Sequence, residues 1–172
     1  MRIIFCVTND IVTDQRVNRI AQTLHKLPSE IVIAGIRRPA SLPLNENAFE
    51  YHRFKMFFKK GPLFYMEYNV RLVFYLLFSN AGILVANDLD TLPAVYLASV
   101  IKKRPVVYDS HEYFTELPEL VGRKTIRNIW KGIENLILPK IKYCYTVSDS
   151  IASEFNRKYG IAMRVVRNLP IR

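Results

Sequence analysis

The stretch ILVANDLDTLPAVYLASVIKKRPVVYDSHE, residues 83–112, contains two short apolar runs separated by a segment with helical spacing. The runs at residues 83–86 and 105–108 are rich in Val and Ile, which is typical of strands buried on both faces of a parallel sheet. Between them, Leu92, Val95 and Tyr96 follow Asp90 at helical intervals. The stretch therefore predicts a strand, a helix and a second strand parallel to the first.

The same alternation extends over the rest of the chain. Further apolar runs occur at residues 2–7, 31–34 and 143–147, and segments with helical spacing follow Asp14 and Ser148. Asp, Ser or Thr before several helical segments supplies side-chain oxygens that can cap the first turn. We therefore predict an α/β fold: a doubly wound, mostly parallel sheet with right-handed crossovers and helices on both faces.

One amphipathic helix is predicted near the start of the last third of the chain. Its apolar positions, at steps of three and four, are Ile126, Ile129, Trp130, Ile133, Leu136 and Ile137. The opposite face carries Lys124, Arg127 and Lys131. This spacing makes the segment the clearest amphipathic helix of the chain.

Composition indicates one globular domain. The chain has 172 residues, of which 50% are apolar and 23% charged, and its net charge of +10 favours polyanionic partners. The N-terminal MRIIFCVTND has an apolar run too short for a signal peptide, so we expect a cytoplasmic chain that starts here. Cys6 and Cys144 lie in predicted strands, which favours a reduced role in the core over a disulfide or a nucleophile.

Residues 51–78 differ from the rest, because ten of the 21 aromatic residues fall there. A turn at Gly61 and Pro62 separates a predicted strand from a helix that begins near Leu63. Its longest uncharged apolar run is residues 72–78, well below the roughly 20 residues that span a bilayer. We therefore expect this helix not to cross a membrane.

Polar side chains follow four of the predicted strands. Because ligands bind beyond the carboxyl ends of strands in open α/β sheets, these residues are predicted to converge at one edge. They are Thr8, Asn9 and Asp10; Asn87, Asp88 and Asp90; Asp109, Ser110, His111 and Glu112; and Ser148, Asp149 and Ser150. Each of them alone can also be explained as a helix cap or a turn residue. Asp14 with Arg16 and Arg19 could hold an anion or form a solvated face.

His111 is the strongest candidate for a functional side chain. An imidazole between two carboxylates can act as a base, an acid or a polar clamp, although a loop histidine with a purely structural role remains an alternative. Asp109, His111 and Glu112 lack a second cluster of ligands, so no metal is predicted. The chain has no GxGxxG, GxxxxGK[ST] or GxSxG motif, so we predict no bound cofactor and no self-sufficient catalytic site.

Four segments together resemble a known family. They are TNDIVTDQRVNRIAQTL at residues 8–24, NDLDTLPAVYLASVIKKRPVVYDSHEYFTELPEL at 87–120, IENLILPKIKYCYTVSDSIASEF at 133–155 and VVRNLP at 165–170. They resemble the N-terminal domain of family-4-like glycosyltransferases of the GT-B fold, with the weakest resemblance from about residue 39 to 80. The resemblance implies a single Rossmann-like domain over residues 1–172, followed in relatives by a donor-binding domain that this chain lacks.

The resemblance also implies a function. In such enzymes the N-terminal domain mainly receives the acceptor, and the C-terminal domain mainly binds the nucleotide-sugar through an E-x7-E motif, usually without a metal. We therefore expect the acceptor-binding half of a hexosyltransferase of polysaccharide biosynthesis, inactive alone, with a nucleotide-sugar donor and a glycan or lipid-linked acceptor as partners. Relatives carry a glycine-rich loop after the first strand, whereas this chain has TNDIVTD.

Several residues match the family's cleft. His111 matches a histidine beside the transferred sugar, Asp88 and Asp90 lie in a loop bordering the acceptor, and Asn168 matches the residue before the interdomain linker. The remaining residues expected in the cleft between acceptor and donor are Asn9, Asp10, Asn87, Asp109, Ser110, Glu112 and Ser148.

Basic residues near aromatic ones suggest a further partner. Lys55, Lys59 and Lys60, together with Lys124, Arg127 and Lys131, could lay the domain on an anionic membrane surface, peripheral to the inner face of the cell membrane. The alternative is that most of the aromatic residues are core. A rival hypothesis for the whole chain is a non-catalytic flavodoxin-like module that binds a small anion or nucleotide. No specific nucleic acid is expected, because the chain lacks any nucleic-acid-binding motif.

Overall fold

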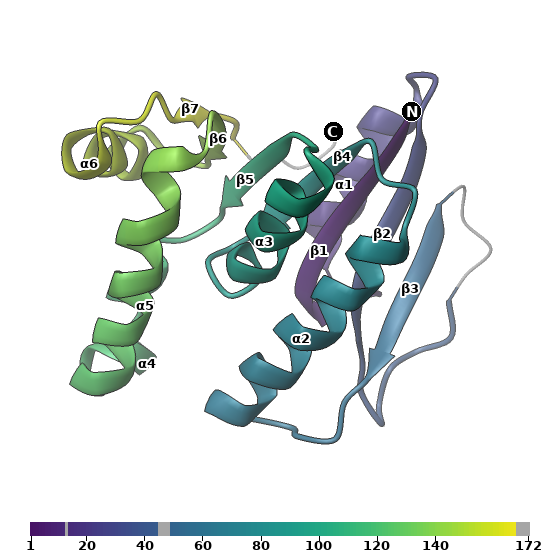
Figure 1. The fold of residues 1–172 in the computed structure, drawn as a ribbon, viewed down its shortest axis with the longest axis horizontal. Helices are drawn as coiled ribbons and strands as arrows, with labels where there is room; N and C mark the ends of the chain where they lie inside the picture. Colours follow the sequence, from purple (N-terminus) through teal and green to yellow (C-terminus); the bar gives the residue numbers. More distant parts are fainter. Residues whose placement is uncertain (13, 45–48, 168–172) are drawn as a thin grey trace.

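A computed structural model describes residues 1–12, 14–44 and 49–167 of the chain (Figure 1). Within these residues, seven strands form one sheet in the order β3-β2-β1-β4-β5-β6-β7, and all of its pairs are parallel. The strands are β1 (Arg2–Asp10), β2 (Glu30–Arg37), β3 (Glu50–Lys55), β4 (Ile83–Asn87), β5 (Val106–Ser110), β6 (Tyr143–Thr146) and β7 (Arg164–Val165). The predicted doubly wound α/β sheet is confirmed.

The strand order distinguishes between two doubly wound topologies. A sheet ordered 3-2-1-4-5-6 is of Rossmann type, whereas flavodoxin-like sheets are ordered 2-1-3-4-5. The observed order therefore excludes the flavodoxin-like topology of the rival hypothesis. The chain reverses direction across the sheet between β1 and β4, and this switch point is where ligands of such sheets bind.

Helices cover both faces of the sheet (Figure 1). On one face, α1 (Gln15–His25) buries Val17 and Ala21 against β1 and β2. The other face carries α2 (Pro62–Phe78), α3 (Leu92–Lys102), α5 (Lys124–Ile137) and α6 (Asp149–Tyr159). Short helical turns, η1 (Phe114–Glu116), α4 (Pro118–Val121) and η2 (Leu138–Lys140), flank α5.

The strands extend further toward the site than the apolar runs predicted. β1 ends at Asp10, β4 at Asn87 and β5 at Ser110. The parallel ladders continue into the polar residues, pairing Asn87 with Asp109 and Ser110 with Thr146. Several candidate residues therefore lie on the last strand positions, where the backbone fixes them, rather than in loops.

The aromatic segment divides between the core and the surface. α2 begins at Pro62, one residue before its predicted start, and buries a row that includes Tyr68, Leu72 and Leu76. Its opposite side exposes Val70 and Phe74. In the part of the chain that the structure describes, no helix has the length and hydrophobicity to cross a membrane.

The predicted amphipathic helix, α5, is only partly buried. Of its apolar positions, Trp130 and Ile137 are buried, whereas Ile129 and Leu136 are 59% and 64% exposed. Glu134 is also buried on this helix, and the apolar pattern did not include it. Its carboxylate accepts hydrogen bonds from Tyr159 and Lys158 of α6. Cys6 and Cys144 are free and buried, as predicted.

Candidate functional site

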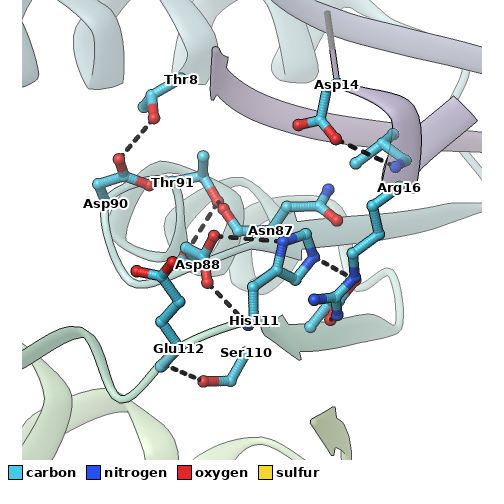
Figure 2. Close-up of polar contacts among 12 residues, drawn as sticks. Thr8, Asp14, Arg16, Asn87, Asp88, Asp90, Thr91, Ser110, His111 and Glu112 are labelled. Carbon is cyan, nitrogen blue, oxygen red and sulfur yellow. Dashed lines mark hydrogen bonds and ion pairs between the residues drawn. The ribbon is translucent and has the colours of Figure 1, made fainter. Parts of the chain in front are cut away.

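The predicted polar residues meet where β1, β4 and β5 end side by side (Figure 2). β1 delivers Thr8 and Asp10, β4 leads into Asp88 and Asp90, and β5 into His111. The switch point thus places together residues from three of the four strand ends that the pattern predicted to converge.

The imidazole of His111 lies between two carboxylates. Its Nε2 is 2.8 Å from Oδ2 of Asp109, and its Nδ1 is 3.6 Å from Oδ2 of Asp88. The backbone N–H of His111 also donates to Oδ1 of Asp88, at 2.9 Å. Because 3.6 Å is too long for a hydrogen bond, Nδ1 is the ring nitrogen that remains able to donate to a ligand.

The carboxylate of Asp109 is the buried centre of the cluster. It is fully buried and accepts hydrogen bonds from Arg16 at 2.5 Å and from the hydroxyl of Tyr145 at 2.8 Å. Together with the contact to His111, these bonds occupy both of its oxygens. Asp109 therefore orients the imidazole, and it is closed to direct contact with a ligand.

The charges around His111 determine its protonation state. Burial alone would lower its pKa, but the hydrogen bond to Asp109 and the charges of Asp88 and Asp109 outweigh burial and raise the pKa above its ordinary value. The imidazole is therefore more cationic near neutral pH than a free histidine. It is suited to donating a hydrogen bond and to stabilising negative charge, and poorly suited to acting as a base.

Asp88 has an unusual backbone conformation. Its φ of 62° lies in the left-handed region, which few residues other than glycine adopt, and its N–H donates to the carbonyl of Asp109. Burial raises the pKa of Asp88 to about 6, although the charge of His111 opposes this shift. Its side chain is 25% exposed, so this carboxylate can reach a ligand. A strained residue beside a buried charge cluster is typical of functional sites.

Asp90 joins the loop after β4 to β1. Its Oδ2 accepts from the hydroxyl of Thr8 at 2.5 Å, and its backbone carbonyl accepts from Asn69 of α2. Burial raises the pKa of Asp90 to about 7, with a further contribution from the charge of Asp88. Among the described residues, its buried Oδ1 has no hydrogen-bond partner. Asp90 is therefore partly protonated at neutral pH.

Asp10 holds the segment after β1. Its carboxylate pairs with Arg53 of β3 at 3.7 Å and accepts a hydrogen bond from the hydroxyl of Ser41. The end of β1 lies close to Gly35 of β2, where an added Cβ would lie 2.9 Å from the carbonyl oxygen of Asn9. Although the segment itself has no glycine, a glycine on the neighbouring strand allows its close approach.

Other predicted cleft residues have structural contacts. Asn87 donates to the carbonyl of Cys6 and so ties β4 to β1, and Ser110 donates to the carbonyl of Glu112, whose side chain is exposed. Ser148 caps α6 by accepting from the N–H of Ile151. Asn168 lies outside the described residues.

The basic membrane candidates fall into two groups. The side chains of Lys55, Lys59, Lys60 and Lys124 are exposed. Arg127 and Lys131 instead form ion pairs with Glu116, which reduces the charge that they offer to a surface.

Sequence patterns missed some of the residues that build the site. Tyr145 lay within a predicted strand, and Arg16 was considered only with Asp14 as an anion site. Asn69, whose side chain also accepts from the N–H of Ala94, links α2 to α3. Asn69 is a polar residue next to the buried row of an apolar helix, and this position was the one sign in the sequence that it has a structural role.

A cavity of about 660 Å³ adjoins the cluster. It is lined by His111, Arg16, Asp10, Asn9 and Arg38, among others. This volume is within the range of about 300–1,000 Å³ that is usual for ligand pockets. Within residues 1–12, 14–44 and 49–167, no group of three or more His, Cys, Asp and Glu residues could hold a metal ion.

Comparison with protein families gives a match that covers most of the chain. The family model described as Glycosyltransferase Family 4 matches residues 14–169. A search of curated proteins found no match.

Several solved structures share the fold. Sucrose-phosphate synthase from Thermosynechococcus elongatus matches with a TM-score of 0.75 at 10% identity, over 97% of this chain and 48% of that chain. Anabaena Alr3699/HepE, solved in complex with UDP-glucose, matches with a TM-score of 0.65 at 17% identity, over 98% of this chain and 44% of that chain. MurG from Acinetobacter baumannii matches with a TM-score of 0.60 at 8% identity, over 100% of this chain and 46% of that chain. The chain thus spans about half the length of these structures and has the fold of one half of a GT-B glycosyltransferase.

Proposed function

Because the chain belongs to glycosyltransferase family 4, we propose that it is the acceptor-binding half of an enzyme that moves a sugar from a nucleotide-sugar to a glycan or lipid-linked acceptor. The observation that carries this proposal is the placement of His111 between Asp88 and Asp109 at the switch point of the sheet. A cavity adjoins His111, and Nδ1 of its imidazole is able to donate a hydrogen bond to a ligand.

The proposed chemistry follows from these protonation states. In the transfer, the bond between the anomeric carbon and the donor phosphate breaks and leaves its electron pair on the phosphate, a bond to an acceptor oxygen forms, and the proton of the acceptor hydroxyl passes to the leaving phosphate. A cationic His111 donates to a hydroxyl of the transferred sugar and stabilises the negative charge that develops on the leaving phosphate. Asp88, with a pKa of about 6 and a partly exposed carboxylate, orients the acceptor hydroxyl.

The donor is bound mainly by a second domain. This part of the proposal is supported by the share of the matched structures, 44% to 48%, that the chain spans. Alr3699/HepE was solved with UDP-glucose, which supports a nucleotide-sugar as the class of donor. Residues 1–172 alone are then inactive, and a hexose is the sugar that we expect to be transferred.

An anionic membrane is the proposed location of the acceptor. The exposed lysines Lys59 and Lys60 lie beside Phe57 and Phe58, which are 82% and 45% exposed. Exposed aromatic residues next to basic ones favour the interface of an anionic bilayer. This arrangement supports a peripheral protein that receives a lipid-linked or polysaccharide acceptor.

Calorimetry with a panel of nucleotide-sugars tests whether donor binding requires the second domain. Residues 1–172 should show no tight binding to any of them. A submicromolar Kd would contradict the proposal that donor binding requires the second domain. Heat released with a hydroxyl-bearing acceptor, lost in Asp88→Ala, would support the proposed acceptor role.

A further inference from the structure

An apolar groove of about 750 Å³ lies between the N-terminal half of α2 and the α4–α5 pair. One wall is aromatic: Trp130 packs edge-on against Tyr65 at 5.4 Å and against Phe114 at 5.3 Å between ring centres. Leu117, Leu120 and Ile133 also line it. The groove is separate from the polar cavity beside Arg16 and Asp10, and its volume suits a small-molecule ligand.

The groove connects the candidate site with an exposed apolar surface. Glu112, which directly follows His111, and Asn69, which binds the backbone of Asp90, both line it. Met66 and Ile129 also line it, and each is 59% exposed. A ligand in the groove can therefore reach from the reacting edge to solvent along an apolar path.

Charges near the groove agree with a ligand that comes from a membrane. The charged residues of the lining itself are Glu112, Glu119 and Arg123, whereas the exposed Lys124, Lys59 and Lys60 lie next in the chain to the lining residues Arg123 and Gly61. Basic residues beside an exposed apolar surface favour contact with anionic lipid. A ligand that enters the groove from a lipid membrane carries a long apolar chain.

We infer that this groove holds the apolar chain of a lipid-type acceptor whose hydroxyl-bearing head lies at His111. This inference rests on the proposed function, and it narrows the acceptor from a glycan or lipid-linked molecule to an amphiphile. Apolar surface is then removed from water on both the chain and the protein, which is the main favourable term in such binding.

The groove contains its own reporter, because Trp130 is the only tryptophan of the chain. An alkyl glucoside brominated on its chain, added below its micelle concentration, should quench Trp130 fluorescence saturably by direct contact. The unbrominated glucoside should bind without this quenching. Glucose alone should have no effect, since it lacks the apolar chain.

Two substitutions of exposed residues test the location. Met66→Asp and Ile129→Asp place a carboxylate in the groove and should each weaken binding about tenfold or more, because burying an unpaired charge is unfavourable. Leu136→Asp is the matched control, since Leu136 is 64% exposed on the same helix but does not line the groove. It should bind as the unsubstituted chain does, and circular dichroism checks that all three variants are folded.

Three outcomes would overturn the inference. They are the absence of saturable quenching, equal weakening by Leu136→Asp, and a dimer that Ile129→Asp dissociates, which would assign the groove to a second copy. Quenching is measured without any nucleotide-sugar, so this binding is tested independently of sugar transfer. Transfer to a water-soluble glycan without any quenching would reject the groove and leave the proposed function standing.

Discussion

The carboxylate of Asp109, which is fully buried, lies 2.8 Å from Nε2 of His111 and holds Arg16 on its other oxygen. Asp109→Asn should therefore lower the pKa of His111, because the substitution removes a charge and a hydrogen bond that raise it. The titration of the imidazole proton by NMR measures this pKa. Tyr145→Phe is the control: it removes a different hydrogen bond of Asp109 and keeps the charge, so the pKa of His111 should change much less. An unchanged pKa in Asp109→Asn would contradict the geometry.

The same substitution should reduce stability. Arg16 is only 13% exposed, and loss of its partner leaves a largely buried cation unpaired. Breaking such a pair costs about 3–5 kcal/mol. Urea unfolding at pH 7 measures the loss, and Arg157→Gln, at a pair whose arginine is 75% exposed, should have little effect. A loss in Asp109→Asn no larger than in this control would show that the buried pair contributes little.

Stability should fall as the pH rises from about 4 to 7. The pKa of Asp90 is raised from 3.8 in the unfolded chain to about 7 in the fold, so over this interval the folded state retains a proton that the unfolded state has lost. A shift of this size corresponds to at most roughly 4 kcal/mol. The raised pKa of Asp88 acts in the same direction over this interval, and that of His111 does so above about pH 6.5.

Asp90→Asn tests this dependence. The amide oxygen can still accept from Thr8, and the variant should be more stable than the unsubstituted chain at pH 8 and less dependent on pH. Urea unfolding at pH 5 and pH 8 gives the comparison. Asp149→Asn, at a site 74% exposed, is the control and should keep the original dependence. If the free energy of unfolding changed equally with pH in Asp90→Asn and in the unsubstituted chain, the raised pKa of Asp90 would be refuted.

Gly35→Ala should disturb the segment after β1. The new Cβ would lie 2.6 Å from Cγ1 of Ile11 and 2.9 Å from the carbonyl oxygen of Asn9, and the second of these is backbone that must move. We expect a loss of about 1–3 kcal/mol. Gly132→Ala, in α5 with nothing within 4 Å of the new atom, should be neutral or slightly stabilising. Thermal unfolding compares the two, and equal effects would disprove the close approach.

Liposome sedimentation tests the proposed membrane contact. Binding should increase with anionic lipid and should fall when Lys59 and Lys60 are both changed to Glu, since each basic residue contributes about 1 kcal/mol. Changing the exposed Lys26 and Lys142 to Glu alters the net charge equally and should matter less. An equal loss of liposome binding in both double variants would show that binding depends only on the net charge. Binding that does not increase with anionic lipid would contradict the proposal.

The sequence indicated the fold well because each buried strand has a distinctive apolar run. Adjacent polar residues also revealed the edge where Asp88, Asp90 and His111 meet. What the pattern missed depends on contacts between distant segments. Residues 16 and 109 are far apart in the chain, and only the strand order brings Arg16 to Asp109. Likewise, Glu134 lies four residues after Trp130 on the buried face of α5, but a charged side chain gives no apolar signal there, and its burial depends on α6.

The most direct test of the central claim is sugar transfer by residues 1–172 joined to the proposed donor-binding domain. With radiolabelled nucleotide-sugars and membrane-derived acceptors, that protein should incorporate label, whereas His111→Ala should lose most of the activity and residues 1–172 alone should show none. Label incorporated equally by the His111→Ala variant, or by residues 1–172 alone, would contradict the assignment of this domain as the acceptor-side half whose histidine faces the transferred sugar.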